Sequence, residues 1–129
     1  MERITTASQP HVLIVEDDFE VRWMLAAVLT AEGYQIDMAS NGAEAISFLE
    51  GGQRPSAVLV DLLMPGVVGQ EFLEYLRDDV QLAEIRVAIV SASPHLAPKG
   101  YRVFNKPFDL QPLLDFLHHG CPVDNERAS

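Results

Sequence analysis

Short apolar runs alternate with amphipathic segments along most of the chain. The first run, His11 to Val15, is rich in β-branched residues and stops abruptly at three acidic residues. Such a continuous run is typical of a strand that is buried on both faces. Further strands are predicted at residues 34–38, 57–60, 87–90 and 101–105.

Between these runs, apolar residues recur at helical spacing. Residues 19–32 show this pattern directly after Asp18, which is a suitable N-cap. Asn41 is a suitable cap for the next helix, which a pair of glycines ends. Two more helices are predicted, around residues 72–76 and at residues 108–119.

One helix is missing from this alternation. Residues 93–100, between the last two predicted strands, hold two prolines, a glycine and no apolar periodicity. Proline and glycine punctuate loops and disfavour helix interiors. We therefore expect a loop or a single turn there.

Strands that alternate with helices over this length indicate an α/β fold. We predict a flavodoxin-like, doubly wound, five-stranded parallel sheet of order 2-1-3-4-5, with its fourth helix short or missing. The 129 residues fit one domain. We expect residues 11–119 to form it, with flexible segments at residues 1–10 and 120–129.

The net charge of the chain limits the classes of partner that it is expected to bind. Nineteen acidic residues against nine basic ones give a formal net charge of -10, which disfavours direct binding to nucleic acid or to an anionic membrane. No apolar run approaches the length that spans a bilayer. Cys121 has no second cysteine with which to pair, so a cytoplasmic location is expected.

Polar residues gather where the predicted strands end. Glu16 and Asp17 follow the first strand, Asp61 the third, Ser91 the fourth and Lys106 the fifth. If the first and third strands are neighbours, the three carboxylates converge at the expected ligand crevice of the sheet. Two carboxylates about 4 Å apart repel by roughly 4 kcal/mol at an effective dielectric of about 20, so the cluster needs cations. Lys106 supplies one charge, and a hard divalent ion such as Mg2+ would supply two.

Taken singly, several of these residues have ordinary interpretations. Asp18 is explained as a helix cap, Ser91 alone would be a strand-end hydroxyl, and Lys106 alone a solvated surface lysine. The four histidines show no ligand spacing, and we assign them no chemistry. Position at one shared edge is what favours a functional interpretation of the rest.

Motifs at these strand ends carry a family resemblance. They are Val15-Glu16-Asp17, Asp61-Leu62-Leu63-Met64-Pro65-Gly66, Gly69, Val90-Ser91-Ala92 and Lys106-Pro107-Phe108. Each alone is a weak signal, but together and in this order they resemble the response regulator receiver domain of two-component signalling, over residues 11–119.

The resemblance implies a metal site and a phosphoacceptor. Asp61 would accept the phosphoryl group. Glu16 and Asp17 would hold Mg2+ together with Asp61, directly or through water, and the backbone carbonyl of Leu63 would complete the protein ligands. Carboxylates are usable phosphoryl acceptors, and the transfer depends mainly on alignment and charge neutralisation.

The same resemblance implies that two more residues would contact the phosphoryl group. Ser91 would hydrogen-bond a phosphoryl oxygen. Lys106 would pair with Asp61 before phosphorylation and with the phosphoryl group after it. The Lys106–Pro107 peptide bond is predicted to be cis, which would aim the lysine.

The resemblance implies a signalling switch rather than an enzyme with an external substrate. A sensor histidine kinase or a phosphotransfer protein would supply the phosphoryl group, hydrolysis would remove it, and an unknown downstream protein would read the state. One alternative is an interaction module that binds its partner without phosphorylation. A hydrolytic phosphatase is disfavoured, because no second aspartate lies two residues after Asp61.

The chain also departs from the family pattern. Val103 stands where the family has an aromatic residue, and Phe104 should face the other side of the strand; Tyr101 is another candidate for the aromatic role. We hypothesise that phosphorylation instead orders or moves residues 92–100. Leu63, two positions after Asp61, is expected to slow attack by water on the acyl phosphate.

Overall fold

The computed structural model describes residues 10–61, 69–91, 97–106 and 110–119. Most of the predicted N-terminal segment and all of the predicted tail lie outside these ranges. The described chain forms β1 (His11–Val15), α2 (Phe19–Ala31), β2 (Gln35–Ala39), α3 (Gly42–Glu50), β3 (Ala57–Asp61), α4 (Gly69–Arg77), the 3-10 helix η1 (Leu82–Glu84), β4 (Arg86–Ser91), β5 (Arg102–Asn105) and α5 (Leu110–His119).

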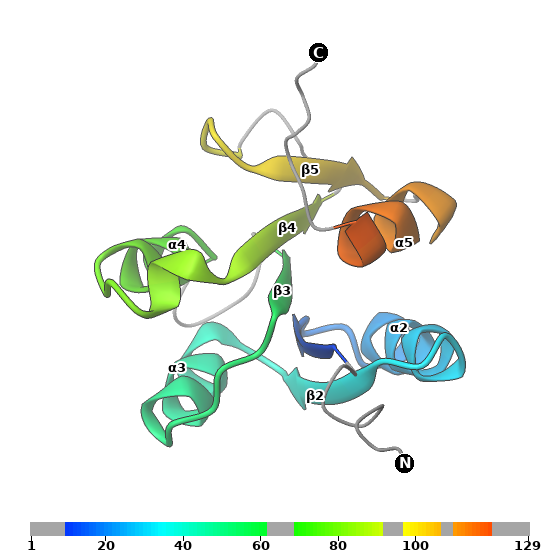
Figure 1. The fold of residues 1–129 in the computed structure, drawn as a ribbon, viewed down its shortest axis with the longest axis horizontal. Coiled ribbons are helices and arrows are strands. Elements are labelled where there is room, and N and C mark those ends of the chain that lie inside the picture. Colours follow the sequence, from blue (N-terminus) through cyan, green and yellow to red (C-terminus); the bar gives the residue numbers. More distant parts are fainter. Residues whose placement is uncertain (1–9, 62–68, 92–96, 107–109, 120–129) are drawn as a thin grey trace.

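The five strands form one parallel sheet in the order β2-β1-β3-β4-β5 (Figure 1). Helices α2 and α5 cover one face of this sheet, and α3 and α4 cover the other. The predicted doubly wound, flavodoxin-like order is confirmed. Because β1 and β3 are parallel neighbours, their carboxyl ends lie at the same edge of the sheet.

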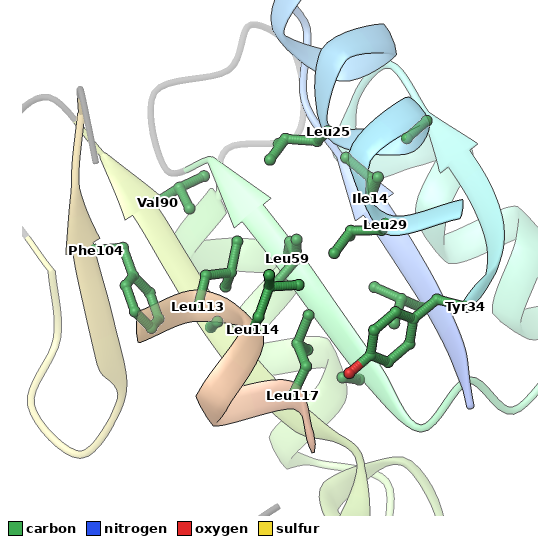
Figure 2. Close-up of a cluster of buried hydrophobic side chains, with 14 residues drawn as sticks. Ile14, Leu25, Leu29, Tyr34, Leu59, Val90, Phe104, Leu113, Leu114 and Leu117 are labelled. Carbon is green, nitrogen blue, oxygen red and sulfur yellow. The ribbon is translucent and has the colours of Figure 1, made fainter. Parts of the chain in front are cut away.

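Successive residues of the central strands supply two separate cores. In β1, Leu13 and Val15 pack toward α3 and α4, whereas Val12 and Ile14 pack toward α2 and α5. Such a strand must be apolar at every position, since side chains alternate between two buried faces. Figure 2 shows the core beneath α2 and α5, in which Leu59 of β3 lies between side chains of both helices.

The turn between β1 and α2 is fixed by a helix cap. The Asp18 side chain accepts hydrogen bonds from the backbone N–H groups of Glu20 and Val21, at 2.9 Å and 3.2 Å. This satisfies two donors that a helix start leaves without partners. The cap confirms the prediction for Asp18, and it starts α2 immediately after the acidic residues that follow β1.

The segment between β4 and β5 is only partly described. Residues 97–101 form turns and no helix, and residues 92–96 lie outside the described chain. In β5, Val103 packs toward the α3 and α4 side and Phe104 is buried on the opposite side. The prediction that these two side chains face opposite ways is therefore confirmed, and Tyr101 lies on the same side as Val103.

The sequence pattern missed η1. Its first turn is closed by Asp79, whose side chain accepts hydrogen bonds from the backbone N–H groups of Gln81 and Leu82. Leu82 is buried against the core beneath α3 and α4. A single apolar residue in a polar stretch shows no periodicity, so only the packing reveals this turn.

We predict that Tyr34→Phe stabilises the fold. Among the described residues, the buried Tyr34 hydroxyl has no hydrogen-bond partner, and an unsatisfied buried hydroxyl costs about 1 kcal/mol or more. Phenylalanine keeps the ring contact with His118. Urea unfolding should show a higher free energy of unfolding than wild type. Leu59→Ala, as a control in the same core, should lower that free energy by about 3 kcal/mol.

Candidate functional site

The strand register brings the polar residues of four strands to one edge. Val15 of β1 lies level with Val60 of β3, so the next residues, Glu16 and Asp61, are also neighbours. Asp61 lies level with Val90 of β4, and Ser91 follows. Lys106 comes directly after β5, whose last pair in the ladder is Ser91 with Asn105.

Three carboxylates meet at this edge. Glu16, Asp17 and Asp61 each offer an oxygen, and these oxygens lie within 4.8 Å of one another. Glu16 and Asp61 are buried, with 1% and 6% of their surfaces exposed, whereas Asp17 is exposed. The cluster is therefore buried at Glu16 and Asp61 and open to solvent at Asp17.

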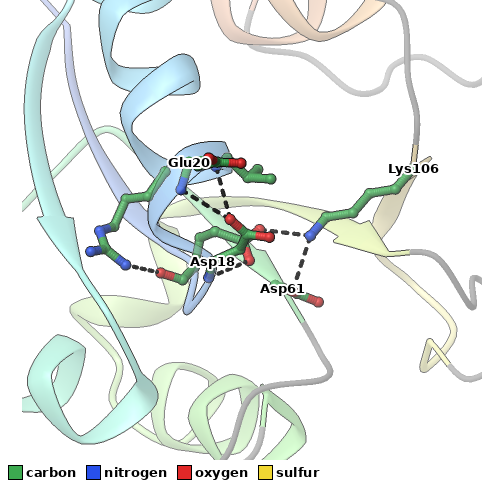
Figure 3. Close-up of polar contacts among 7 residues, drawn as sticks. Asp18, Glu20, Asp61 and Lys106 are labelled. Carbon is green, nitrogen blue, oxygen red and sulfur yellow. Dashed lines mark hydrogen bonds and ion pairs between the residues drawn. The ribbon is translucent and has the colours of Figure 1, made fainter.

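Lys106 bridges the two buried carboxylates. Its Nζ donates to Glu16 Oε1 at 2.7 Å and to Asp61 Oδ2 at 3.1 Å. Figure 3 shows the lysine side chain extending across the edge toward Asp61. Burial lowers the pKa of Lys106, but the hydrogen bonds that its ammonium donates to the two carboxylates, together with their charges, outweigh burial and leave the pKa raised. The ammonium group therefore stays charged.

Glu16 is held in place through both its side chain and its backbone. Its Oε2 accepts a hydrogen bond from the Asp18 N–H at 3.1 Å, and its own N–H donates to Ala39 O at 3.1 Å. Burial raises the pKa of Glu16 to about 7, and the nearby Asp61 charge adds to the increase, against the opposing hydrogen bonds from Lys106 and the Asp18 amide. The ionised form of Glu16 is thus incompletely compensated.

These observations test whether the residues fit a divalent cation. Three carboxylate oxygens face one another, and Lys106 is the only cation whose ion pairs with them are described. Hard ions such as Mg2+ prefer oxygen ligands and keep several waters, which the open side at Asp17 permits. The described donor set therefore fits such an ion.

Not all of the predicted site lies within the described chain. The structure brings together Glu16, Asp17, Asp61 and Lys106 and places Ser91, fully buried, at the end of the neighbouring strand. The Leu63 carbonyl and the Lys106–Pro107 peptide bond fall partly or wholly outside the described residues.

Sequence reasoning missed one contact and one residue. It paired Lys106 with Asp61 alone, but the shorter contact is with Glu16. It also gave no role to Arg22, whose Nη1 donates to the Glu16 carbonyl at 2.7 Å. A signal was present for Arg22, because a residue in the second turn of a helix can reach back to the strand end that precedes the helix.

Comparison with known proteins gives the same class as the fold and the edge chemistry. The response regulator receiver domain family matches residues 12–118. The chain is 33% identical over 121 residues to Sporulation initiation phosphotransferase F of Bacillus subtilis (strain 168), covering 87% of this chain and 94% of that protein. It is 32% identical over 106 residues to Response regulator Rre1 of Synechocystis sp., covering 76% of this chain and 46% of Rre1.

Solved structures of response regulators have the same fold. The response regulator protein TrrA from Thermotoga maritima, whose structure is a complex with Mg(2+)-BeF, superposes with a TM-score of 0.76 at 26% identity, over 86% of this chain and 98% of that one. The chemotaxis response regulator CheY4 of Vibrio cholerae shares the fold, with a TM-score of 0.77 at 24% identity, over 88% of this chain and 100% of that one.

The chain belongs to the response regulator receiver domain family. It is a phosphoacceptor domain of two-component signalling. It spans nearly all of the sporulation phosphotransferase and about half of Rre1. None of the helices in the described ranges is both long and apolar enough to cross a membrane.

We predict that Mg2+ stabilises the wild-type protein through Asp17. At an ion concentration ten times the dissociation constant, the free energy of unfolding should rise by about 1.4 kcal/mol. Asp17→Asn should be more stable than wild type without metal, because carboxylate repulsion is relieved, and should gain much less from Mg2+. Urea unfolding with and without Mg2+ measures both effects.

Asp18→Asn is the matched control for this experiment. It removes the same charge one residue away, and asparagine caps a helix about as well as aspartate. Because Asp18 is outside the carboxylate cluster, this variant should keep most of the stabilisation by Mg2+. Equal losses in both variants would mean that only the total charge of the turn matters.

Proposed function

We propose that Asp61 is the phosphoacceptor and that Glu16, Asp17 and Asp61 hold Mg2+ beside it, with the Leu63 carbonyl as a further ligand. The observation that carries this proposal is the cluster of three carboxylates at the carboxyl edge of the sheet, two of which pair with the same lysine. The TrrA complex with Mg(2+)-BeF supports the choice of metal.

In the proposed reaction, a carboxylate oxygen of Asp61 attacks the phosphorus of a phosphohistidine. An O–P bond forms as the N–P bond breaks, and the donor histidine leaves with the electron pair of that bond. Bound Mg2+ would neutralise charge on the transferring phosphoryl group. Asp61 is fixed for this role, because it ends a strand paired on both sides.

Lys106 and Ser91 take up the new group. After transfer, Asp61 carries the phosphoryl oxygens, and the Lys106 ammonium, already 3.1 Å from Asp61, pairs with one of them. The Ser91 hydroxyl donates to another. The Lys106 N–H donates to the Ser91 carbonyl at 2.8 Å, so the two residues are fixed relative to each other by their backbones.

We propose that the chain performs no chemistry on an external substrate beyond its own phosphorylation and dephosphorylation. Water would attack the acyl phosphate and return Asp61 to its free form. The part of the chain that acts in this way is residues 11–119. We further propose that it acts in the cytoplasm, and through proteins rather than nucleic acid or membrane, as its net charge of -10 favours.

The phosphoryl group would come from a sensor histidine kinase or a phosphotransfer protein. Large apolar side chains are exposed next to the site at the start of α2: Phe19 is 62% exposed and Trp23 50%. Their rings contact each other edge to face, with centroids 5.9 Å apart. We propose that the phosphodonor protein docks on this pair, because it must bring its histidine to the same edge.

We predict that a small phosphodonor adds one phosphoryl group to the wild-type protein only when Mg2+ is present. Asp61→Asn should gain none, because its amide is not a usable nucleophile. Intact mass measured before and after incubation shows the addition. An added phosphoryl group in the Asp61→Asn protein, or a full yield without Mg2+, would contradict the assignment.

We also predict that Phe19→Ala and Trp23→Ala impair transfer from a protein donor alone. With a phosphotransfer protein that labels the wild-type chain, kcat/KM should fall about tenfold or more, since buried aromatic anchors dominate interface energies. Labelling by the small donor should be unchanged. The control is Val80→Ala, which changes another exposed apolar residue, distant in sequence from Phe19 and Trp23. This substitution should affect neither reaction.

A further inference from the structure

Arg22 reaches from α2 back to the end of β1. It lies four residues into α2, and its Nη1 donates to the backbone carbonyl of Glu16 at 2.7 Å. The side chain is half-buried, and its guanidinium carbon lies 5.6 Å from the centroid of the Phe19 ring. The guanidinium is planar and always charged, so it is suited to hold one carbonyl in one direction.

This contact completes the anchoring of Glu16. The backbone N–H of Glu16 donates to Ala39 O, and its two carboxylate oxygens accept from Asp18 and Lys106. The carbonyl is the remaining backbone group, and Arg22 is the described residue that holds it. Unlike Lys106, Arg22 makes no described contact with a carboxylate of the cluster.

The held carbonyl also restricts the backbone of Asp17. The Glu16 carbonyl and the Asp17 N–H belong to one planar peptide group. Fixing the direction of that carbonyl fixes the plane and the place of the Asp17 Cα within it, so that rotation about the Asp17 N–Cα bond is the backbone freedom left to aim the side chain. Asp17 is exposed and has no described hydrogen bond of its own, so its position depends on the backbone more than that of Glu16 does.

We infer that Arg22 is a positioning residue for the divalent-cation site, which holds the Glu16–Asp17 peptide so that both carboxylates face Asp61. This inference rests on the proposed metal site. Outer residues that orient metal ligands typically change metal affinity by 10- to 100-fold when they are replaced. Arg22 does so through the backbone, without touching the ion.

The sign of the effect separates this role from simple electrostatics. Removal of a nearby positive charge should strengthen the binding of a cation, because it removes a repulsion. Loss of the positioning contact should instead weaken binding. Arg22→Met removes the charge and the donor together, so the two explanations predict changes of opposite direction in Mg2+ affinity.

Arg54 provides a matched control. Its Nη1 also donates to backbone carbonyls, those of Leu49 at 3.0 Å and Gln53 at 2.7 Å. These lie before β3, at the edge of the sheet opposite the carboxylate cluster. Arg54→Met therefore removes the same charge and the same type of contact away from the site.

The experiment is calorimetric titration of Mg2+ into wild type, Arg22→Met, Arg22→Lys and Arg54→Met, with urea unfolding of each metal-free protein. We expect Arg22→Met to bind Mg2+ roughly tenfold more weakly than wild type. Arg22→Lys, which keeps the charge and one donor, should recover part of the loss, and Arg54→Met should bind as wild type does. Amide exchange of Asp17 and Asp18 in the metal-free protein should be faster in Arg22→Met alone.

Several outcomes overturn the inference. Equal or tighter Mg2+ binding by Arg22→Met, while wild type binds normally, refutes it and leaves the proposed function intact. An equal loss in Arg54→Met would reduce the effect to general destabilisation and also refutes it. If wild type itself binds no Mg2+ at millimolar concentration, the metal site of the proposed function fails, and the inference fails with it.

Discussion

The repulsion among three carboxylates at one edge of the sheet is the constraint on which the rest of the structure depends. Glu16, Asp17 and Asp61 lie together because β1 and β3 are neighbours in a parallel sheet, and the apolar strands that hold them are buried on both faces. Two separate cores therefore fix an arrangement that electrostatics alone would disperse. Lys106 relieves part of the repulsion, and in the proposed function a bound cation would relieve more and supply charge for the phosphoryl transfer.

Much of this arrangement is predictable from the sequence, because a buried parallel strand must be apolar on both faces. The limits of β1 follow from the change at Val15 to Glu16, and the start of α2 from the cap at Asp18. Once strand order is inferred, the carboxyl ends of β1 and β3 bring Asp17 and Asp61 together without further information.

Other features depend on packing and have no local signature. The 3-10 turn around Leu82 forms because one leucine fills the core beside α4, not because of any periodicity. The shorter pairing of Lys106 with Glu16 depends on side-chain directions across 90 residues of sequence. The same is true of the Tyr34 hydroxyl, whose lack of a described partner results from how Tyr34 packs in the core beneath α2 and α5.

The position of β5 in the sheet gives the site an uneven mechanical stiffness. Asp61 ends β3, which is hydrogen-bonded to a strand on each side, whereas Lys106 follows β5, which is an edge strand held by β4 through four residue pairs. A change of charge at the site therefore acts between Asp61 on the rigid strand β3 and Lys106 beside the more easily displaced strand β5. We expect β5, with its Val103 side chain, to move more readily than the strands at the centre of the sheet.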